Sequence, residues 1–501
     1  MQGFTYIDLI ILVVYLAAVL FAGLHFAKKE MKGKEYFKGD GTVPWWVTSV
    51  SIFATLLSPI SFLSLAGNSY AGTWIMWFAQ LGMLLAIPLT IKFFLPIYSK
   101  LDIDTAYHYL ELRFGSKGLR VLGAVMFIVY QIGRMSIIMY LPCMVLGSLT
   151  GINVNLLIII MGVIAIIYSY TGGLKSVLWT DFIQGSVLLI GVTFALIFLL
   201  AHLDGGIGAI FQAFATEHKF LAVDQPIFNP NIFKDSVFIM IVGAGFNTMG
   251  SYVSSQDIVQ RFTTTTDTKK LNKMMLTNGA LSIFIATVFY LIGTGLFVFY
   301  KQNALPPAAA QDQIFASYIA FELPVGVTGL LLAAIYAAAQ STLSTGLNSV
   351  ASSWTLDIQS SLSKKELGFE KETKIGQRVS LIVGIFAIVV AMVLANGGVK
   401  SAYEWFNGFM GLVLGILIGT FILGAFTKVA NTFGAVCAFV AASAVMVYIK
   451  YFVPADHVSI WSYSIISIVV SLVIGIPASI IWRKVKGDDS VPAPDTTIYK
   501  N

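Results

Sequence analysis

Thirteen apolar runs, each of about 20 residues, limit the fold of this 501-residue chain more than any other feature of its sequence. A run of that length crosses the hydrocarbon core of a bilayer as an α-helix. Charged residues make up only 11% of the sequence and hydrophobic ones 57%, a balance that a soluble chain of this size does not have. We therefore predict an all-α polytopic membrane protein with 13 transmembrane helices.

The runs lie at residues 7–27, 45–70, 74–98, 118–148, 153–171, 177–202, 234–260, 272–300, 324–354, 377–396, 403–425, 429–451 and 459–483. A single membrane domain over residues 1–501 accounts for all of them. Residues 488–501 contain two prolines and little apolar content, so we predict a disordered tail there.

Lysine and arginine predict how the chain lies in the membrane. With the N-terminus outside, the inner connections hold 24 of these residues and the outer ones 5. This asymmetry follows the positive-inside rule and predicts a cytoplasmic C-terminus. The net charge of +6 is then explained by inner loops and requires no nucleic acid. Both cysteines, Cys143 and Cys437, fall within apolar runs, so we predict no disulfide.

A stripe of hydroxyls interrupts the apolar run 324–354. Ser341, Thr342, Thr345 and Ser349 share one face of a helix, with Ser344 beside them. Hydroxyl and carbonyl oxygens are the ligands that a hard cation prefers. The alternative is that these side chains bond back to the preceding turn or allow close helix packing.

Two runs carry helix-breaking residues at matching places. Pro59, in the second run, removes an amide and clashes with the carbonyl of residue 55, which leaves carbonyls near Ala54 to Ser58 in need of a partner. In the seventh run, Gly243, Gly245, Gly250 and Asn247 indicate a second break. Paired interruptions of this kind are typical of transporters built from inverted repeats. The alternative is a proline kink and a glycine packing face.

The repeat hypothesis divides the chain further. We predict one extra helix at 7–27, inverted five-helix repeats at 45–202 and 234–425, and two extra helices at 429–483.

Arg134 lies in the middle of the fourth run, where a buried cation costs at least about 2.5 kcal/mol. Acidic residues such as Asp257 sit near the ends of other runs, so we predict that no acid lies at the depth of Arg134. Its partner is then expected to be a substrate carboxylate, held by two parallel hydrogen bonds. Gln80, Ser58 and Ser61 would add neutral hydrogen bonds, although Gln80 could equally join two helices.

Asp181 begins the inner part of the sixth run. It is either a cation ligand that reaches Ser344 and Thr345, or an ion-pair partner of Lys175 or a helix cap. The chain has no Cys/His metal spacing, no HExxH or GxSxG motif and no phosphate-binding glycine loop. We therefore predict neither an enzyme nor a carrier driven by ATP.

Three segments resemble the sodium/solute symporter family, and the resemblance covers essentially the whole chain. They are GGLKSVLWTDFIQ at 172–184, SQDIVQR at 255–261 and AIYAAAQSTLST at 334–345. The family has a leucine-transporter-like fold with one extra helix before the repeats, and this fold is expected here.

The resemblance also implies cation sites. One sodium is expected at the carbonyls of Ala54, Leu57 and Ala338 and the hydroxyls of Ser341 and Thr342. Within the family the chain is most similar to bacterial sialic acid symporters, in which a second sodium maps onto Asp181, Ser341, Ser344 and Thr345.

The same group shares the Ser58 and Ser61 spacing, Gln80, and an arginine after Ile-Gly that meets the sialic acid carboxylate. The substrate is expected to contact Ser58, Ser61, Met76, Phe78, Gln80, Arg134, Phe246 and Asn247. Pro59, where a small polar residue is expected, and Met76, where relatives can have an aromatic residue, depart from the group's pattern.

These expectations combine into one hypothesis: a monomeric sodium symporter of the bacterial plasma membrane that imports sialic acid by alternating access. The alternatives are a sodium symporter for proline, a monocarboxylate or a neutral sugar, and a proton-coupled carrier with Asp181 as its titrating group. A channel is a further alternative, but the sequence has no repeated filter or pore loop.

Overall fold

The structure is a computed structural model that describes residues 5–26, 34–39, 41–231, 233–303, 313–363, 368–397, 402–454, 457–487 and 492–499. Every regular element in these ranges is a helix, which confirms the all-α class. The first half contains α1 (Tyr6–Phe26), α2 (Lys34–Lys38), α3 (Trp45–Leu56), α4 (Pro59–Ala71), η1 (Ile75–Gly82), α5 (Met83–Leu89), η2 (Thr90–Phe94), α6 (Leu95–Leu101), α7 (Ala106–Phe114), α8 (Lys117–Thr150), α9 (Val154–Ala201) and α10 (Gly206–Thr216). The second half contains α11 (Val237–Ser254), α12 (Gln256–Phe262), α13 (Thr268–Gln302), α14 (Ile314–Phe321), α15 (Val327–Ser352), η4 (Ser353–Gln359), α16 (Ser360–Leu362), α17 (Phe369–Asn396), α18 (Ala402–Phe426), α19 (Thr432–Phe452), η5 (Ile460–Ser462) and α20 (Tyr463–Lys486).

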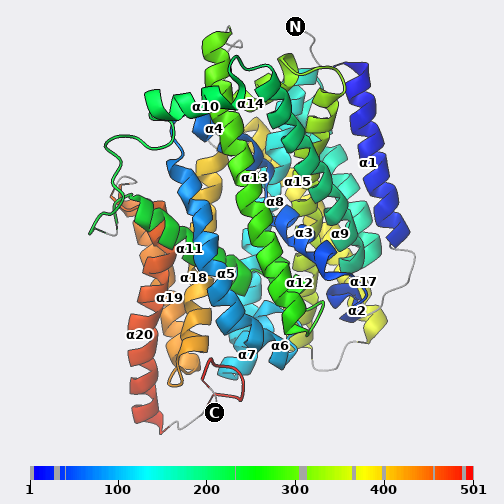
Figure 1. Ribbon diagram of the computed structural model, residues 1–501. Helices are drawn as coiled ribbons and strands as arrows, with labels where there is room; N and C mark the ends of the chain where they lie inside the picture. Colours follow the sequence, from blue (N-terminus) through cyan, green and yellow to red (C-terminus); the bar gives the residue numbers. More distant parts are fainter. Residues whose placement is uncertain are drawn as a thin grey trace.

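Length and composition make this a multi-pass membrane protein. Within the described ranges, 10 helices can cross a membrane, and the bent pair α3–α4 makes 11. Two shorter apolar helices, Val154–Ile167 and Val413–Phe426, overlap the predicted runs 153–171 and 403–425. The count of 13 therefore stays a prediction for those two segments. Figure 1 shows α1 beginning at one end of the bundle and α20 finishing at the other.

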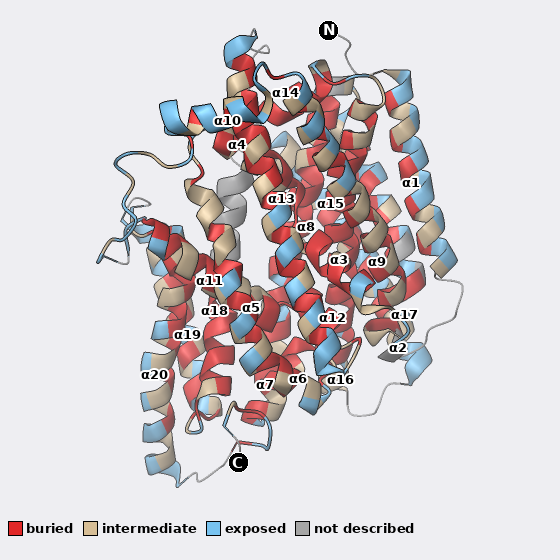
Figure 2. Cartoon of the chain, in the orientation of Figure 1, coloured by how far each residue is buried: buried red, intermediate tan, exposed pale blue. Residues whose placement is uncertain are grey.

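Helix α15 forms the centre of the bundle, and nearly all of its residues are buried (Figure 2). This helix carries small residues, namely the alanines at 333, 334 and 337–339 and Gly346. Their small side chains allow α8, α9 and α3 to pack closely against it. Its serines and threonines are therefore enclosed by protein rather than lipid. This placement makes the hydroxyl stripe available to neighbouring helices.

A kink at Gly173 separates the two predicted runs that α9 joins. Its backbone has φ 55° and ψ −157°, a conformation that glycine adopts without steric cost. A side chain at this position would also meet the carbonyl oxygen of Tyr36, only 2.6 Å from its Cβ. The kink lies just before the turn that carries Asp181, and it sets the direction of that segment.

The predicted break within residues 243–250 is wrong. Helix α11 runs unbroken through these glycines to Ser254, and the interruption lies at Ser255, whose φ of −93° and ψ of 116° are extended. The glycines form a packing face instead: a Cβ on Gly82 would come 2.5 Å from the Gly245 amide nitrogen, and one on Gly243 would meet the carbonyl of Trp461. Close backbone contact therefore explains the glycines.

The prediction of a disordered tail is wrong for residues 492–499. Thr496 is fully buried, its carbonyl accepts a hydrogen bond from Tyr109, and the amide of Ile498 donates to Ala425. Lys100 forms an ion pair with Asp495 at 2.8 Å. Backbone pairing with the end of α18 orders a segment whose composition alone indicates disorder. The rest of the predicted tail lies outside the described residues.

The two cysteines, Cys143 and Cys437, are both free, as expected.

Candidate functional site

The break between α3 and α4 follows from Pro59, as predicted. The two helices meet at 64°, with Leu57 and Ser58 extended between them. Pro59 begins α4, where its missing amide costs nothing. The Ser58 hydroxyl caps the new helix by accepting from the Ser61 amide at 3.2 Å.

The carbonyls freed at this break face the hydroxyls of α15. Without an amide at Pro59, the Thr55 carbonyl loses its helical partner and accepts from Thr342 at 3.4 Å. The Ala54 carbonyl accepts from Ser341 at 2.9 Å. Both hydroxyls also donate to the Ala338 carbonyl, at 3.2 and 3.1 Å. The residues that carry these oxygens are fully buried, and each of the two hydroxyls is within hydrogen-bonding distance of two of the carbonyls. Neutral oxygens of this kind are ligands that a hard metal cation prefers.

Four of the five ligands expected for the first cation thus lie together. They are the carbonyls of Ala54 and Ala338 and the hydroxyls of Ser341 and Thr342. No contact of the described residues brings in the Leu57 carbonyl, whereas the Thr55 carbonyl joins the group. Thr55 was not among the expected ligands, although the sequence places its carbonyl among those that Pro59 leaves without a partner.

Asp181 does reach the hydroxyl stripe from α9. Its carboxylate lies 3.4 Å from Ser344 and 3.1 Å from Thr345. The hydroxyl of Ser51 donates to it at 2.6 Å. The predicted grouping is therefore present, and Lys175, the alternative partner, instead donates to Thr42 at 2.8 Å.

The cation that faces Asp181 in this structure is Arg261, which the sequence argument did not single out. Its guanidinium lies 2.7 Å from the Asp181 carboxylate and is completely buried. It also donates to Thr345 and to Ser51. Among the described residues, the carboxylate oxygen Oδ2 takes all the short contacts, while Oδ1 has only the longer one to Ser344. A further cation would approach Asp181 on the Oδ1 side.

The prediction that Arg134 lacks an acidic neighbour is wrong. Its guanidinium forms an ion pair with Asp257 at 2.6 Å, and both side chains are buried. It also donates to the freed Thr55 carbonyl at 2.7 Å. The break at Ser255 carries Asp257 into the bundle, so an acid that seems to lie near the end of a run is at the depth of Arg134.

Helix α12 joins the two ion pairs. Asp257 and Arg261 lie one turn apart on it, and Arg261 also donates to the Asp257 carbonyl. The Thr55 hydroxyl lies 3.2 Å from that of Thr345, so the hydrogen bonds around these ion pairs extend to the break between α3 and α4. The SQDIVQR motif was the sequence signal for this helix, because a charged pair spaced by four residues inside an apolar chain must find buried partners.

The remaining residues expected to contact substrate are more scattered. Ser58 and Ser61 lie 3.2 Å apart at the start of α4. Met76, Phe78 and Gln80 share η1, where Met76 accepts from Asn68.

The two predicted residues of α11 have other neighbours. The exposed Asn247 accepts from Ser464 of α20, and Phe246 packs against the apolar cluster around α5 and α18. No contact in the described part of the chain joins either residue to the first break.

These features define a class: a helical membrane bundle in which two interrupted helices meet at a buried cluster of oxygens and ion pairs. The sodium:solute symporter family model matches residues 36–441, and the chain belongs to that family. The prediction of a symporter family, and of a transporter rather than an enzyme, is confirmed.

Particular relatives and one solved structure are similar over almost the whole chain. The sodium/sialic acid symporter SiaT of Proteus mirabilis (strain HI4320) is 34% identical, with 98% of this chain and 99% of the relative covered. The sodium/sialic acid symporter NanT of Aliivibrio fischeri (strain ATCC 700601 / ES114) is 30% identical, with 100% and 98% covered. A solved Na⁺-coupled sialic acid symporter, substrate-bound and outward-open, matches with a TM-score of 0.88 at 33% identity, over 95% of this chain and 98% of that one.

Proposed function

We propose that this protein is a sodium-coupled symporter that imports sialic acid across the bacterial plasma membrane. One observation carries the proposal: the carbonyls freed by Pro59 meet the hydroxyls of α15 and form a buried cluster of oxygens where the broken helix α3–α4 packs against α15. The similarity to two sodium/sialic acid symporters supports the choice of substrate.

Sodium is a co-transported ion in this proposal. The first site comprises the oxygens of Ala54, Ala338, Ser341 and Thr342, which the Thr55 carbonyl joins. Leu57 would contribute only if its carbonyl turns toward them. A second sodium is proposed at Asp181, Ser344 and Thr345, with Ser341 next to them, and it would share the carboxylate with Arg261.

The substrate carboxylate is proposed to bind Arg134. In the structure Asp257 already neutralises this arginine, so the substrate must compete with Asp257 or share the guanidinium with it. A guanidinium has five N–H groups in a planar fork, which permits sharing. Ser58, Ser61, Met76, Phe78, Gln80, Phe246 and Asn247 remain the proposed lining of the substrate path.

Alternating access would follow from movement of one helix group against another about the two breaks. We propose 13 transmembrane helices with two inverted repeats, an external N-terminus, a cytoplasmic C-terminus and a functional monomer. The lysine and arginine asymmetry supports this orientation.

The deciding experiment is uptake of radiolabelled sialic acid into proteoliposomes that contain the purified chain. We expect accumulation with an inward sodium gradient and none when choline replaces sodium at constant pH. Accumulation that follows a proton gradient instead would favour the proton-coupled alternative. Competition by proline, a monocarboxylate or a neutral sugar that exceeds competition by unlabelled sialic acid would overturn the choice of substrate.

The second sodium needs its own test, because removal of Asp181 alone leaves Arg261 buried without a partner. The double variant Asp181→Asn with Arg261→Gln removes both charges. We expect the sodium dependence of its uptake to lose cooperativity, with a Hill coefficient near one, if wild type shows a value above one. An unchanged cooperative curve would restrict sodium to the first site.

A further inference from the structure

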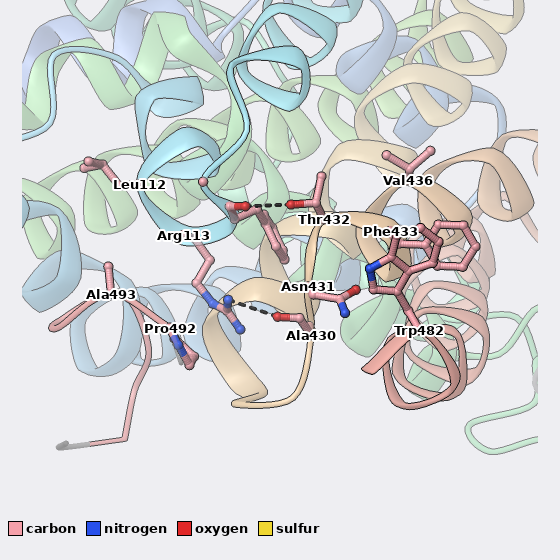
Figure 3. Close-up of a pocket in the computed structure, with 12 residues that line it drawn as sticks. Leu112, Arg113, Ala430, Asn431, Thr432, Phe433, Val436, Trp482, Pro492 and Ala493 are labelled. Atoms are coloured by element: carbon pink, nitrogen blue, oxygen red, sulfur yellow. Dashed lines mark hydrogen bonds between the residues drawn. The ribbon is translucent and has the colours of Figure 1, made fainter. Parts of the chain in front are cut away.

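A cavity of about 580 Å³, whose lining Figure 3 shows, lies outside the ion and substrate region, at the end of the bundle where Figure 1 marks the C-terminus. The start of α19, the end of α20, the end of α7 and the ordered tail line it. The lining residues are Leu112, Arg113, Phe114, Gly115, Ala430, Asn431, Thr432, Phe433, Val436, Trp482, Pro492 and Ala493. Its size is typical of cavities that hold small organic ligands.

Arg113 gives the cavity its charge. The side chain is only 4% exposed and donates to the carbonyls of Gly424, Thr427 and Ala430. Three of its five N–H groups are thereby used, which leaves two for a ligand. No carboxylate of the described residues pairs with it. Burial lowers the pKa of this guanidinium, and the positive charge of Arg483 lowers it further.

More cations surround the cavity. Lys428 and Lys486 are exposed, and they lie over the rings of Tyr499 and Trp482 at 5.7 and 5.6 Å. Arg483 donates to the Lys428 carbonyl. Asp488 and Asp489 follow α20 in the sequence and lie outside the described residues. The described surroundings therefore favour an anion.

The N-terminus of α19 adds backbone donors. Asn431 caps this 21-residue helix by accepting from the Gly434 amide, so the first-turn amides of Thr432 and Phe433 are left without a helical partner. Such amides, with the positive end of the helix dipole, bind phosphate groups. Arg113 and this helix end both border the cavity, as Figure 3 shows.

The outer wall is apolar and suited to lipid. Phe433 and Val436 are each 40% exposed on α19, a helix that can span the membrane. Phe433 stacks on Trp482 with ring centroids 4.4 Å apart. A tryptophan at the end of a membrane helix usually lies at the level of the lipid head groups. Acyl chains can therefore run along Phe433 and Val436 while a head group enters the cavity.

We infer that this cavity binds the head group of an anionic phospholipid from the leaflet on the C-terminal side. The phosphate would lie between the Arg113 guanidinium and the first turn of α19, and Trp482 would lie beside the glycerol backbone. Basic pockets between membrane helices are known sites for such lipids.

Quenching of Trp482 fluorescence tests the inference directly. The full chain is reconstituted in phosphatidylcholine vesicles with a bromine-labelled lipid, either phosphatidylglycerol or phosphatidylcholine, at equal mole fractions. We expect the labelled phosphatidylglycerol to quench more strongly, and the excess to vanish in Trp482→Phe. Equal quenching by the two lipids in wild type would overturn the inference.

Two variants separate head-group binding from general surface charge. Arg113→Gln should raise the phosphatidylglycerol fraction needed for half of the excess quenching by about tenfold, the loss expected for a hydrogen bond to a charged group. Because Arg113 also holds the α18–α19 connection, Val436→Phe provides a second variant that narrows the cavity, keeps every charge and adds no tryptophan. Lys269→Gln, a basic residue on α13, is the matched control and should leave the excess unchanged.

The remaining outcomes also decide the matter. An excess that survives both Arg113→Gln and Val436→Phe would place the lipid elsewhere. Loss of the excess on addition of millimolar inorganic phosphate would identify a soluble anion as the ligand instead. The double variant Asp488→Asn with Asp489→Asn should strengthen the preference for phosphatidylglycerol, because it removes the acids nearest in sequence.

Discussion

At the scale of single residues, the buried charges of this protein are arranged in pairs that share partners. Arg134 is paired with Asp257, and Arg261 with Asp181. Removal of one member of a buried pair costs about 3–5 kcal/mol of stability, because the other charge is left uncompensated. A single substitution at Arg134 therefore cannot separate a role in binding from a role in folding.

Removal of both charges of the first pair makes that separation. We predict that Arg134→Met with Asp257→Asn folds better than Arg134→Met alone, yet does not transport sialic acid, because the guanidinium that receives the carboxylate is gone. Asp257→Asn alone keeps that guanidinium, so added substrate should raise its thermal midpoint more than that of wild type. The midpoints and the uptake of the three variants are the measurements. Normal uptake by the double variant would show that the carboxylate binds elsewhere.

The buried Lys219, at the opposite end of the bundle, leads us to predict that the stability of the protein depends on pH. It is buried in the α10–α11 connection, where its ammonium donates to the carbonyls of Tyr70 and Gly72. Lys219 and Lys301 both lie over the ring of Phe297, at 3.8 and 4.6 Å. Burial, together with the charge of Lys301, lowers the pKa of Lys219 to about 8.

The sign of this effect follows from proton binding. Unfolded lysine has a pKa of about 10.4, so between pH 8 and that value the unfolded chain holds more protons than the folded one. The contribution of Lys219 to stability is then lowest below pH 8 and rises as the pH increases from 8 to about 10.4. We predict that the thermal midpoint of wild type minus that of Lys219→Met increases across this pH range. A difference that stays flat or falls would contradict the prediction.

At the scale of the elements, the broken helix α3–α4 depends on one proline. Pro59→Ala would restore an amide that can bond to the Thr55 carbonyl and continue the helix. That carbonyl would then no longer be available to Thr342 and Arg134. We predict that the variant needs about tenfold more sodium for half-maximal stabilisation in a thermal-shift titration, as expected for the loss of one hydrogen-bond acceptor at the site. Pro477→Ala in the remote α20 is the matched control. If it raises the sodium requirement as much as Pro59→Ala does, the effect does not come from the Thr55 carbonyl.

The same comparison shows what the sequence can predict. The apolar runs place most membrane helices, because hydrophobic length is a local property, and Pro59 locates the first break because its effect is also local. Gly243, Gly245 and Gly250 misled the prediction of the second break, since glycine serves backbone contact as well as unwinding and only the neighbouring helices decide which. Arg261 and the ordered tail were missed for a related reason: their partners are distant in sequence.

At the scale of the whole molecule, both breaks, α15 and the two ion pairs meet in one buried network, so sodium and substrate should affect each other through it. Coupling between two binding sites is reciprocal: if sodium tightens sialic acid binding by some factor, sialic acid must tighten sodium binding by the same factor.

We predict that, in wild type, the factor by which sodium tightens sialic acid binding equals the factor by which sialic acid tightens sodium binding. Each ligand is titrated by thermal shift with and without the other, and choline replaces sodium in the samples without sodium. Ser341→Ala should reduce both factors together, because its hydroxyl joins the Ala54 and Ala338 carbonyls. Ser349→Ala, at the far end of the same stripe, should leave them unchanged, since among the described residues its hydroxyl donates only to the Gly346 carbonyl. If sialic acid binds equally well in sodium and choline, the network does not couple the two ligands and the proposed symport fails.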